Sequence, residues 1–244
     1  MAVVATLIAA PSPNVVQTRL ADGFDFPVGK PNAEGYYKSR GWLRYHPGED
    51  WNRLSGGNSD LGDPVYNVAN GLVVFAKDAR RGWGNVVIIR HTYFENGQLR
   101  SVDSFYAHLA SITVREGQQI LRGQQVGTIG TNRGMYTAHL HFEMRQNLNI
   151  GVNRSAFKID LNNYFMPTKF LDAHRRLPGS GRSALVAVNT FQNGGMEFAP
   201  PYNELLGRKG RPAQELTKRN ASSRQPAEPK REFRVNRFED LGSF

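Results

Sequence analysis

The sequence of 244 residues contains no cysteine, which excludes disulfide bonds, thiol catalysis and cysteine-ligated metal sites. Any metal that the chain binds must therefore be held by histidine and carboxylate side chains. No segment approaches the ~20 consecutive apolar residues of a membrane-spanning helix. The opening MAVVATLIAAPSP is mainly apolar only over residues 2–10 and has no basic stretch before that core. We therefore expect a flexible end or an edge strand there, with a trimmed or degenerate export signal as the alternative.

Acidic residues are few relative to basic ones. The chain has 21 Asp and Glu against 31 Lys and Arg, which gives a formal net charge of +10. Such a charge favours an anionic partner, for which nucleic acid, an acidic membrane surface and a cell wall with acidic polymers are the alternatives. Because no recognised nucleic-acid-binding motif accompanies the charge, we expect no nucleic-acid partner.

Short β-rich runs separated by Gly and Asn fill the middle of the chain. The stretch DPVYNVANGLVVFAK contains two such runs joined at Asn70-Gly71, which predicts a hairpin because both residues tolerate positive φ. GNVVIIRH and SVDSFYAHL predict two further strands, and glycines interrupt VREGQQILRGQQVGTIG at nearly regular intervals. No sustained 3.6-residue apolar period occurs there, so we expect a mainly β, antiparallel fold.

The chain is long enough to bury a full hydrophobic core, and we expect one compact domain with two long ends. The predicted regions are an N-terminal extension over residues 1–30, a domain over 31–177 and a C-terminal extension over 178–244. PTKFLDAHRRL, at the end of the domain, predicts a short closing helix. Residues 202–244 hold ten Lys and Arg against six Asp and Glu and few aliphatic residues, which is typical of a largely disordered tail.

The stretch AHLHFEMR carries two histidines two positions apart. Successive side chains of a β-strand point to opposite faces. His139 and His141 therefore share a polar face with Glu143 and Arg145, whereas the apolar residues between them face the core. An isolated H-x-H motif on a polar face is most often only solvated, so other parts of the chain must decide its role.

A second motif, YHPGEDWN, carries His46 and Asp50. Pro47 and Gly48 predict a tight turn, because a residue before proline is pushed out of the α region and glycine bends freely. Such a turn can bring His46 and Asp50 together, with Glu49 as a rival oxygen ligand. Two imidazoles and one carboxylate are typical of a catalytic zinc site whose fourth position is open to water. His46, Asp50 and one histidine of the H-x-H strand would supply this set.

A third motif, FYAHL, places His108 at the end of a predicted strand, as a candidate proton carrier or oxyanion partner beside the metal. The three motifs, in this order, resemble the lysostaphin and LytM family of zinc endopeptidases, which cut the peptides of peptidoglycan. The resemblance runs from Tyr45 to Glu143 and extends to the connecting phrases GDPVYNVANGLVV, GWGNVVIIRH and VREGQQILRGQQVGTIG.

The resemblance implies a LytM/lysostaphin-like fold, related to the barrel-sandwich folds, in which antiparallel sheets form a groove and a short helix lies at the periphery. It implies that His46, Asp50 and His141 ligate Zn2+, while His108 and His139 stay unligated and act on the water and the scissile carbonyl. The implied function is that of a zinc metalloendopeptidase and peptidoglycan hydrolase in the periplasm or outside the cell. Its partners would be the peptide stems or bridges of peptidoglycan and anionic cell-wall polymers.

Two alternatives differ in class from a peptidase. A non-enzymatic LytM-type regulator would activate a cell-wall amidase, but such regulators typically lack part of the ligand set, which is complete here. A biotinyl or lipoyl carrier module would need a lysine at an exposed hairpin tip, and no suitable triplet occurs. The family usually has Gly-Pro just before H-x-H, whereas this chain has GTNRGMYTAHLHF, so the motif leaves the substrate preference open.

Several residues near these motifs have plainer interpretations. We expect His91 to be structural and His174 to lie on the surface. Glu143 is either an acceptor that orients the ring of His141 or a solvated surface residue. The larger aromatic residues of the region are expected to pack in the core rather than to bind sugars; these are Trp51, Trp83 and Tyr106.

Overall fold

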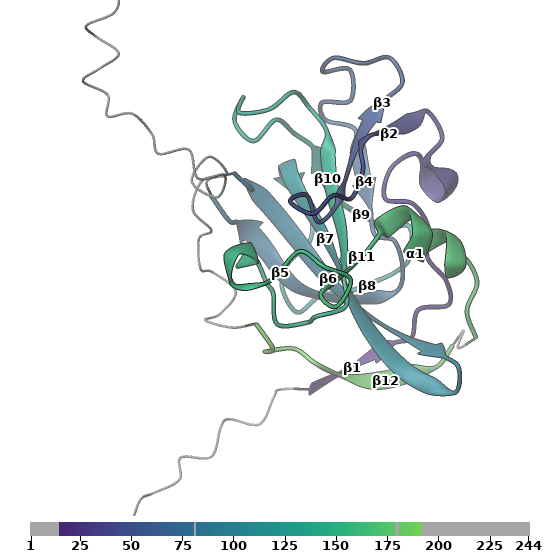
Figure 1. Ribbon diagram of the computed structural model, residues 1–244. Coiled ribbons are helices and arrows are strands. Elements are labelled where there is room, and N and C mark those ends of the chain that lie inside the picture. The colour runs from purple at the N-terminus through teal and green to yellow at the C-terminus, as the bar shows by residue number, and fades with distance from the viewer. Residues whose placement is uncertain (1–14, 81, 179–180, 192–244) are drawn as a thin grey trace, which may run out of the picture. The chain divides into compact units, whose positions relative to one another are not determined.

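The computed structural model describes residues 15–80, 82–178 and 181–191, which Figure 1 shows in colour. Within them the fold is mainly β, as the sequence predicts. The strands are β1 (Val15–Arg19), β2 (Tyr36–Arg40), β3 (Glu49–Arg53), β4 (Pro64–Tyr66), β5 (Gly71–Asp78), β6 (Asn85–Glu95), β7 (Gln98–Ile112), β8 (Gln119–Ile120), β9 (Gln125–Ile129), β10 (Leu140–Arg145), β11 (Tyr164–Phe165) and β12 (Ser183–Ala187). The helical segments are η1 (Gly29–Ala33), η2 (Arg154–Ala156) and α1 (Pro167–Ala173), the last of which confirms the predicted short helix.

One ten-stranded sheet positions the candidate site. Its order is β2-β3-β10-β7-β6-β5-β8, with β11 paired to β10 and β9 paired to both β7 and β4. Every pairing between the described strands is antiparallel. The H-x-H strand, β10, lies between β3 and β7. The strands that carry the other two motifs are therefore its immediate neighbours.

The central strands of this sheet are buried on both faces. Four consecutive residues of β6, from Val86 to Ile89, are all fully buried. Val87 and Ile89 belong to one core cluster, whereas Val86 and Ile88 belong to a second cluster on the other side. A strand covered on both faces needs an uninterrupted apolar run instead of an alternating one. This requirement explains the composition of GNVVIIRH.

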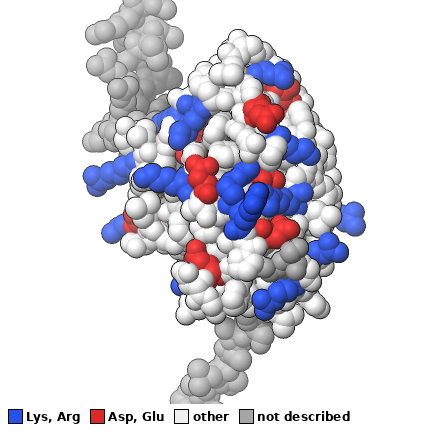
Figure 2. Space-filling model, turned by 90° about the vertical axis from the view of Figure 1, so that its right-hand side faces the viewer, with Lys and Arg blue, Asp and Glu red and all other residues white. Residues whose placement is uncertain are grey.

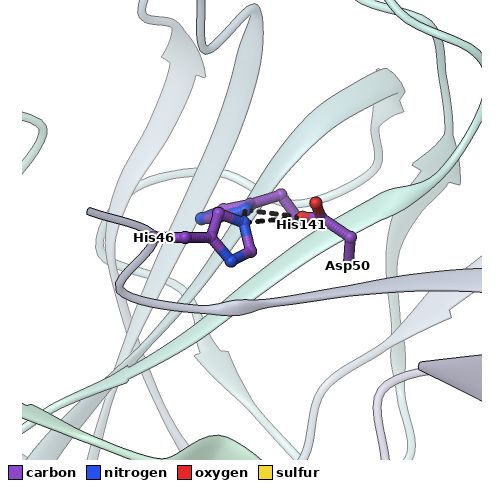
Figure 3. Close-up of side chains that lie close together, drawn as sticks. All are labelled: His46, Asp50 and His141. Atoms are coloured by element: carbon purple, nitrogen blue, oxygen red, sulfur yellow. Dashed lines mark hydrogen bonds and ion pairs between the residues drawn. The ribbon is translucent and has the colours of Figure 1, made fainter. Parts of the chain in front are cut away.

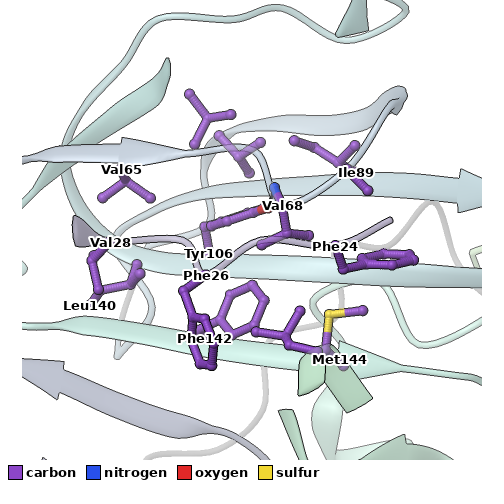
Figure 4. Packing of buried hydrophobic residues seen from close by; sticks show 14 of the residues in the cluster. Phe24, Phe26, Val28, Val65, Val68, Ile89, Tyr106, Leu140, Phe142 and Met144 are labelled. Atoms are coloured by element: carbon purple, nitrogen blue, oxygen red, sulfur yellow. Dashed lines mark hydrogen bonds between the residues drawn. The ribbon is translucent and has the colours of Figure 1, made fainter. Parts of the chain in front are cut away.

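The larger core cluster joins β10 to the chain before the sheet begins. Leu140, Phe142 and Met144 pack in one cluster with Phe24 and Phe26 (Figure 4). Burying one large apolar side chain stabilises a fold by ~1.5–3 kcal/mol, so this contact is substantial. It confirms that the apolar side of the H-x-H strand faces the core.

The chain on either side of the predicted domain takes part in further structure. Strands β1 and β12 pair with each other in a separate two-stranded sheet. A buried ion pair links this sheet to the main one, because Arg90 donates to both oxygens of Asp103, at 2.8 and 2.7 Å, and to the carbonyl of Ala187 at 2.6 Å. The boundaries at residues 30 and 177 stay predictions, and most of the predicted tail, like the apolar opening stretch, lies outside the described residues.

The hairpin predicted at Asn70-Gly71 is wrong. Strand β4 pairs with β9, and β5 pairs with β6 and β8, so the two runs are not neighbours. The Asn70 side chain instead bridges two distant segments, donating to Leu20 O at 3.1 Å and accepting from Arg122 N at 3.0 Å. Gly71 is needed for close packing, since a Cβ there would lie 2.6 Å from Arg90 O.

A hairpin that the sequence analysis missed lies between β6 and β7. Its turn is formed by Asn96 and Gly97, with φ of +48° and +79°. Positive φ at both central residues is the requirement that makes Asn-Gly the preferred pair for two-residue hairpin turns. The same dipeptide therefore has two roles in this chain, and only the tertiary pairing distinguishes them.

Basic side chains on the surface are interspersed with acidic ones. Figure 2 shows this mixture on one face of the molecule, with several basic groups near its centre. Arg122 and Arg175 both contact Asp25 Oδ1, at 2.5 and 3.3 Å. Part of the positive charge is thus compensated locally. Among the described helices, none has the length and apolar character needed to cross a membrane.

His91 is a buried structural residue of β6, as the sequence predicts. Its Nδ1 lies 3.0 Å from Asn70 O and its Nε2 lies 2.7 Å from Ser104 Oγ. The ring also packs edge-on against Phe24, with the centroids 5.4 Å apart. Burial lowers the pKa of His91 from 6.5 to about 4, because a charged imidazole would lose its hydration there.

The lowered pKa of His91 makes the free energy of unfolding depend on pH. His91 takes up a proton near pH 6.5 in the unfolded chain but only near pH 4 in the folded chain. Its contribution to the free energy of unfolding is therefore complete above pH 6.5 and is lost as the pH falls toward 4. The difference corresponds to roughly 3 kcal/mol. Between pH 7 and pH 4, metal-free wild-type protein should therefore lose about that much more unfolding free energy than the His91→Gln variant. Denaturant titrations at both pH values measure this, and equal losses in the two proteins would contradict it.

Candidate metal centre

The site begins with the pairing of two strands. In the antiparallel pair of β3 and β10, His141 lies directly opposite Asp50. Directly opposed residues of an antiparallel pair project from the same face and touch. The Nδ1 atom of His141 accordingly lies 2.9 Å from Oδ1 of Asp50. The His141 side chain is 3% exposed and that of Asp50 13%, so the pair is shielded from bulk water.

His46 reaches the pair from the loop before β3. Leu43 and His46 exchange two backbone hydrogen bonds, so the turn is centred on Arg44 and Tyr45, before the Pro47-Gly48 position that the sequence predicts. This turn places His46 Nε2 3.1 Å from Asp50 Oδ1 and 3.1 Å from His141 Nδ1. Figure 3 shows the three side chains converging.

Gly48 lets this loop lie against β10. A Cβ atom at position 48 would lie 2.5 Å from the carbonyl oxygen of Phe142 and 2.8 Å from Cγ of Glu143. Real Cβ atoms essentially never approach other atoms so closely. The glycine is therefore needed for space between His46 and Asp50, and not for a left-handed backbone conformation.

The hydrogen bonds around the two imidazoles fix which nitrogen faces the centre. Nδ1 of His46 lies 2.9 Å from the carbonyl of Gly41, and Nε2 of His141 lies 2.8 Å from Oε1 of Glu143. Both partners can only accept, so these nitrogens must carry the hydrogen. In the neutral rings, Nε2 of His46 and Nδ1 of His141 then both present lone pairs to each other and to Asp50. Three electron-pair donors so close together require a positive charge between them.

Glu143 is in turn held by Arg145, which the sequence analysis placed on the same strand face but gave no role. Nε of Arg145 lies 2.6 Å from Oε2 of Glu143, and the guanidinium also donates to the carbonyl of Gly151. Burial raises the pKa of Glu143, but the charge of Arg145 and the hydrogen bond from His141 outweigh it and lower the pKa to about 2. A carboxylate that accepts from a ligating histidine orients the ring and raises its basicity.

In the absence of a metal, the centre holds a proton. Burial lowers the pKa of His141, but the hydrogen bonds with Asp50 and Glu143 outweigh it and raise the pKa to about 9. Burial likewise raises the pKa of Asp50, yet the hydrogen bonds from His141 and His46 hold it well below the ordinary value. The centre is thus built to contain one positive charge.

The distances fit a small tetrahedral ion. With zinc bonds of ~2.0–2.1 Å, the donor atoms of a tetrahedral site lie about 3.3 Å apart. The three donor separations here are 2.9, 3.1 and 3.1 Å. His46, Asp50 and His141 are the one group of three or more His, Cys, Asp or Glu residues that could hold a metal within the part of the chain that the structure describes. The residues present therefore fit zinc, with one coordination position left open.

His108 lies at an irregularity inside β7, and not at a strand end. Its φ is +62°, which is uncommon for a residue other than glycine. The register between β6 and β7 shifts at this point, and both the backbone N and Nδ1 of His108 lie within 3.2 Å of Trp83 O. Irregularities of this kind re-aim side chains. The ring of His108 accordingly faces His141, with the centroids 5.7 Å apart.

His139 lies beside both His108 and Asp50. Its Nδ1 is 2.8 Å from Thr137 O, which directs Nε2 inward to 3.8 Å from Asp50 Oδ1. The rings of His108 and His139 are 4.9 Å apart. The structure thus brings together all five predicted site residues, with the three candidate ligands in contact and the two other histidines beside them.

Glu49, the rival oxygen ligand, points away from the centre. Adjacent residues of a strand face opposite ways, so Glu49 and Asp50 of β3 diverge. The Glu49 carboxylate instead accepts from Thr168 N, at 3.2 and 3.3 Å, and from Thr168 Oγ1 at 2.6 Å, at the start of α1. A carboxylate is favourable at a helix N-terminus.

His174 and the three large aromatic residues near the motifs all take part in packing. His174 is not a plain surface residue, because its ring stacks on Phe170 at 4.1 Å and its Nε2 lies 2.8 Å from Glu95 Oε1. Trp51 and Tyr106 are core residues, as predicted. Trp83 packs beside the centre, with its ring 5.4 Å from that of His141. The i,i+4 spacing of Phe170 and His174 in the predicted helix places both rings on one face, whereas the local sequence carries no signal for the position of Trp83.

Comparison with known proteins identifies the family. The model of peptidase family M23 matches residues 44–153. Lipoprotein NlpD of Yersinia enterocolitica is 38% identical over 84 residues, which are 34% of this chain and 78% of that protein. The chain belongs to peptidase family M23.

Other relatives are longer proteins. Murein hydrolase activator NlpD of Escherichia coli strain K12 is 36% identical over 103 residues, which are 40% of this chain and 25% of that protein. The chain thus matches about a quarter of the length of this relative. Among solved structures, the catalytic domain of the antimicrobial peptidase lysostaphin from Staphylococcus simulans is 24% identical with a TM-score of 0.42, covering 56% of this chain and 92% of that one.

The close approach at Gly48 leads to a matched pair of variants. Gly48→Ala should weaken zinc binding by about tenfold or more, because the displaced loop carries His46 and leads directly into β3, which carries Asp50. Gly41→Ala should bind zinc like the wild type, since a Cβ there meets nothing within 4 Å and the carbonyl that holds His46 remains. Competition with a chromogenic chelator measures both constants. Equal zinc affinity in the two variants would contradict the role of Gly48.

Zinc binding should depend on pH with a definite sign. Since the pKa of His141 is about 9 without metal, an incoming ion must displace a proton below that pH. The apparent association constant should therefore rise about tenfold per pH unit between about pH 7 and 8.5. Calorimetry in two buffers of different ionisation enthalpy counts the released protons. Release of about one proton per zinc ion bound supports the account, and release of almost none contradicts it.

Proposed function

We propose that this chain is a zinc-dependent hydrolase that cleaves peptide bonds of peptidoglycan. The observation that carries the proposal is the convergence of His46, Asp50 and His141 with both imidazole lone pairs directed inward. Zinc in such a site supplies Lewis acidity, which polarises a peptide carbonyl and makes water a nucleophile near neutral pH. The membership of family M23 supports the proposal without establishing activity in this chain.

His108 and His139 are the candidate catalytic residues. Each is oriented by a backbone carbonyl at Nδ1, which leaves Nε2 free to face the open position. Burial and the charges of His141 and His139 keep the pKa of His108 well below its ordinary value, so its ring is neutral and can accept a proton at neutral pH. His139, whose Nε2 lies 3.8 Å from Asp50 Oδ1, is placed to stabilise an oxyanion that develops in the transition state, by donating from Nε2 when that nitrogen also carries a proton.

The relatives support a substrate class and a location for this proposal. Murein is peptidoglycan, and the related proteins are called a murein hydrolase activator and a lipoprotein. We infer that the chain works in the cell envelope, in the periplasm or outside the cell. Its peptidoglycan substrate is anionic where peptide stems carry carboxylates, which suits the net charge of +10. Anionic wall polymers are a second partner of the same charge.

A second candidate function is activation of a separate cell-wall amidase without hydrolysis. The name of the NlpD relatives, murein hydrolase activator, favours this candidate over hydrolysis. The complete centre favours hydrolysis, since a binding surface for an amidase needs no metal ligands, no proton acceptor and no open coordination position. Hydrolysis requires the zinc ligands and the catalytic histidines, whereas activation of an amidase does not. Variants of these residues therefore distinguish the two candidates.

Two alanine variants test the proposal. His141→Ala should lose zinc and hydrolysis together, because it removes a ligand. His139→Ala should keep about one zinc per chain while its turnover falls by ~10² or more, because it acts only along the reaction coordinate. The measurements are zinc content and the new amino termini released from purified sacculi, identified by mass spectrometry.

The same variants distinguish the activator. If the chain only activates an amidase, zinc-loaded wild-type protein releases no peptide termini, and both variants stimulate a purified amidase as the wild type does. If it is a hydrolase, the wild type releases termini without any amidase. A zinc-free His139→Ala protein would show that the roles of the two histidines are reversed.

A further inference from the structure

The strand ladder beside the centre ends one step before His139. The pairing of β3 with β10 runs from Phe142 to Leu140, where Leu140 faces Trp51. At the next peptide two asparagine side chains replace the backbone ladder. Asn58 Oδ1 lies 2.8 Å from Ala138 N, and Asn52 Nδ2 lies 2.9 Å from Ala138 O. The backbone of Ala138 is thus held at both its N–H and its C=O group.

The chemical role of each asparagine is unambiguous. A backbone N–H can only donate, so Asn58 must present its oxygen, and a backbone carbonyl can only accept, so Asn52 must present its NH2 group. The hydroxyl of Ser39 lies 2.5 Å from Oδ1 of Asn52, which fixes the orientation of that amide. One asparagine accepts and the other donates. We call the pair the Asn52/Asn58 clamp.

The clamp lies between the candidate ligands and a candidate catalytic residue. Asn52 follows Asp50 by two positions in β3, so both side chains emerge on the same face. Ala138 directly precedes His139, whose own backbone N makes only a long contact of 3.4 Å with Gly130 O. The side chain of His139 contacts Thr137 O, within its own loop. The clamp therefore connects β3, which carries Asp50, directly to the residue before His139, in addition to the backbone bridge between Gly130 and His139.

We propose that Asn52 and Asn58 are positioning residues that hold the backbone of Ala138, directly before His139, and so aim the His139 imidazole at the open coordination position. The proposal rests on the zinc-dependent function proposed above. It assigns a role to the loop after β3, because Asn58 belongs to that loop and reaches across 80 positions of sequence to Ala138. The two residues act through His139 and do not touch the reacting atoms.

The same substitution at the two positions should have opposite results. Aspartate at neutral pH can accept hydrogen bonds but cannot donate them. Asn52→Asp loses the donor to Ala138 O and should lower kcat about tenfold or more, since small displacements of a catalytic group are costly. Asn58→Ala should lower kcat by roughly threefold to tenfold, because the bond it removes is partly exposed. Asn58→Asp keeps the acceptor and should restore most of that loss.

Matched measurements separate positioning from general damage. All variants should keep about one zinc per chain and a KM close to that of the wild type. Asn149→Asp, at an exposed site, controls for the added negative charge. Hydrogen exchange at the Ala138 amide should accelerate in Asn58→Ala and slow again in Asn58→Asp. In protein loaded with cobalt(II), paramagnetic relaxation of the His139 ring protons should weaken in Asn52→Asp and remain in Asn58→Asp.

The cobalt(II) measurement keeps this proposal separate from the proposed function. If the wild type binds the metal but cleaves no peptidoglycan, hydrolysis fails as the function, while the His139 relaxation and the Ala138 exchange still decide whether the clamp positions the ring. If Asn52→Asp retains wild-type relaxation and turnover, or if both aspartate variants behave alike, the clamp proposal is overturned.

Discussion

The pairing of β3 with β10 is the constraint on which the site depends. In this register Asp50 lies opposite His141, and a slip by one residue would turn every side chain of β10 to the other face. The apolar residues Leu140, Phe142 and Met144 prevent such a slip, since they are fully buried in the core. The free energy of core packing thereby fixes the geometry of the polar face. The register of β3 and β10 therefore determines both where the candidate ligands lie and how the core packs.

The polar face of β10 is itself buried, which requires that its charges compensate one another. Arg145 neutralises Glu143, Glu143 orients His141, and His141 with Asp50 receives a proton or a metal ion. Removing one member of such a chain leaves an uncompensated buried charge, which is typically more costly than the pair is stabilising. The Asn52/Asn58 clamp adds neutral hydrogen bonds at the end of the same strand. Compensated charges and hydrogen bonds thus follow β10 from Arg145 at one end to the segment before His139 at the other.

Much of the centre could be predicted from the sequence because its information is local. The alternation of AHLHFEMR indicates both faces of β10, and the family resemblance carried by the three motifs implies the ligand set. The predictions that failed concern residues whose contacts are with distant segments of the chain. Asn-Gly at 96–97 forms a hairpin while Asn-Gly at 70–71 does not, because Asn70 bonds to segments about 50 residues away in either direction. Glu49 could be excluded only once residues 49–53 were known to form a strand, and the contact of Asn58 with Ala138 has no local signal.

The central claim is that His46, Asp50 and His141 together hold a zinc ion. Anomalous scattering at the zinc edge, from crystals of the zinc-loaded chain, tests it most directly. The account predicts one strong peak at ~2.0–2.1 Å from Nε2 of His46, an Asp50 carboxylate oxygen and Nδ1 of His141, with His108 and His139 outside bonding distance. A peak bound through His139 in place of His141, or no peak between these residues after loading, would contradict it.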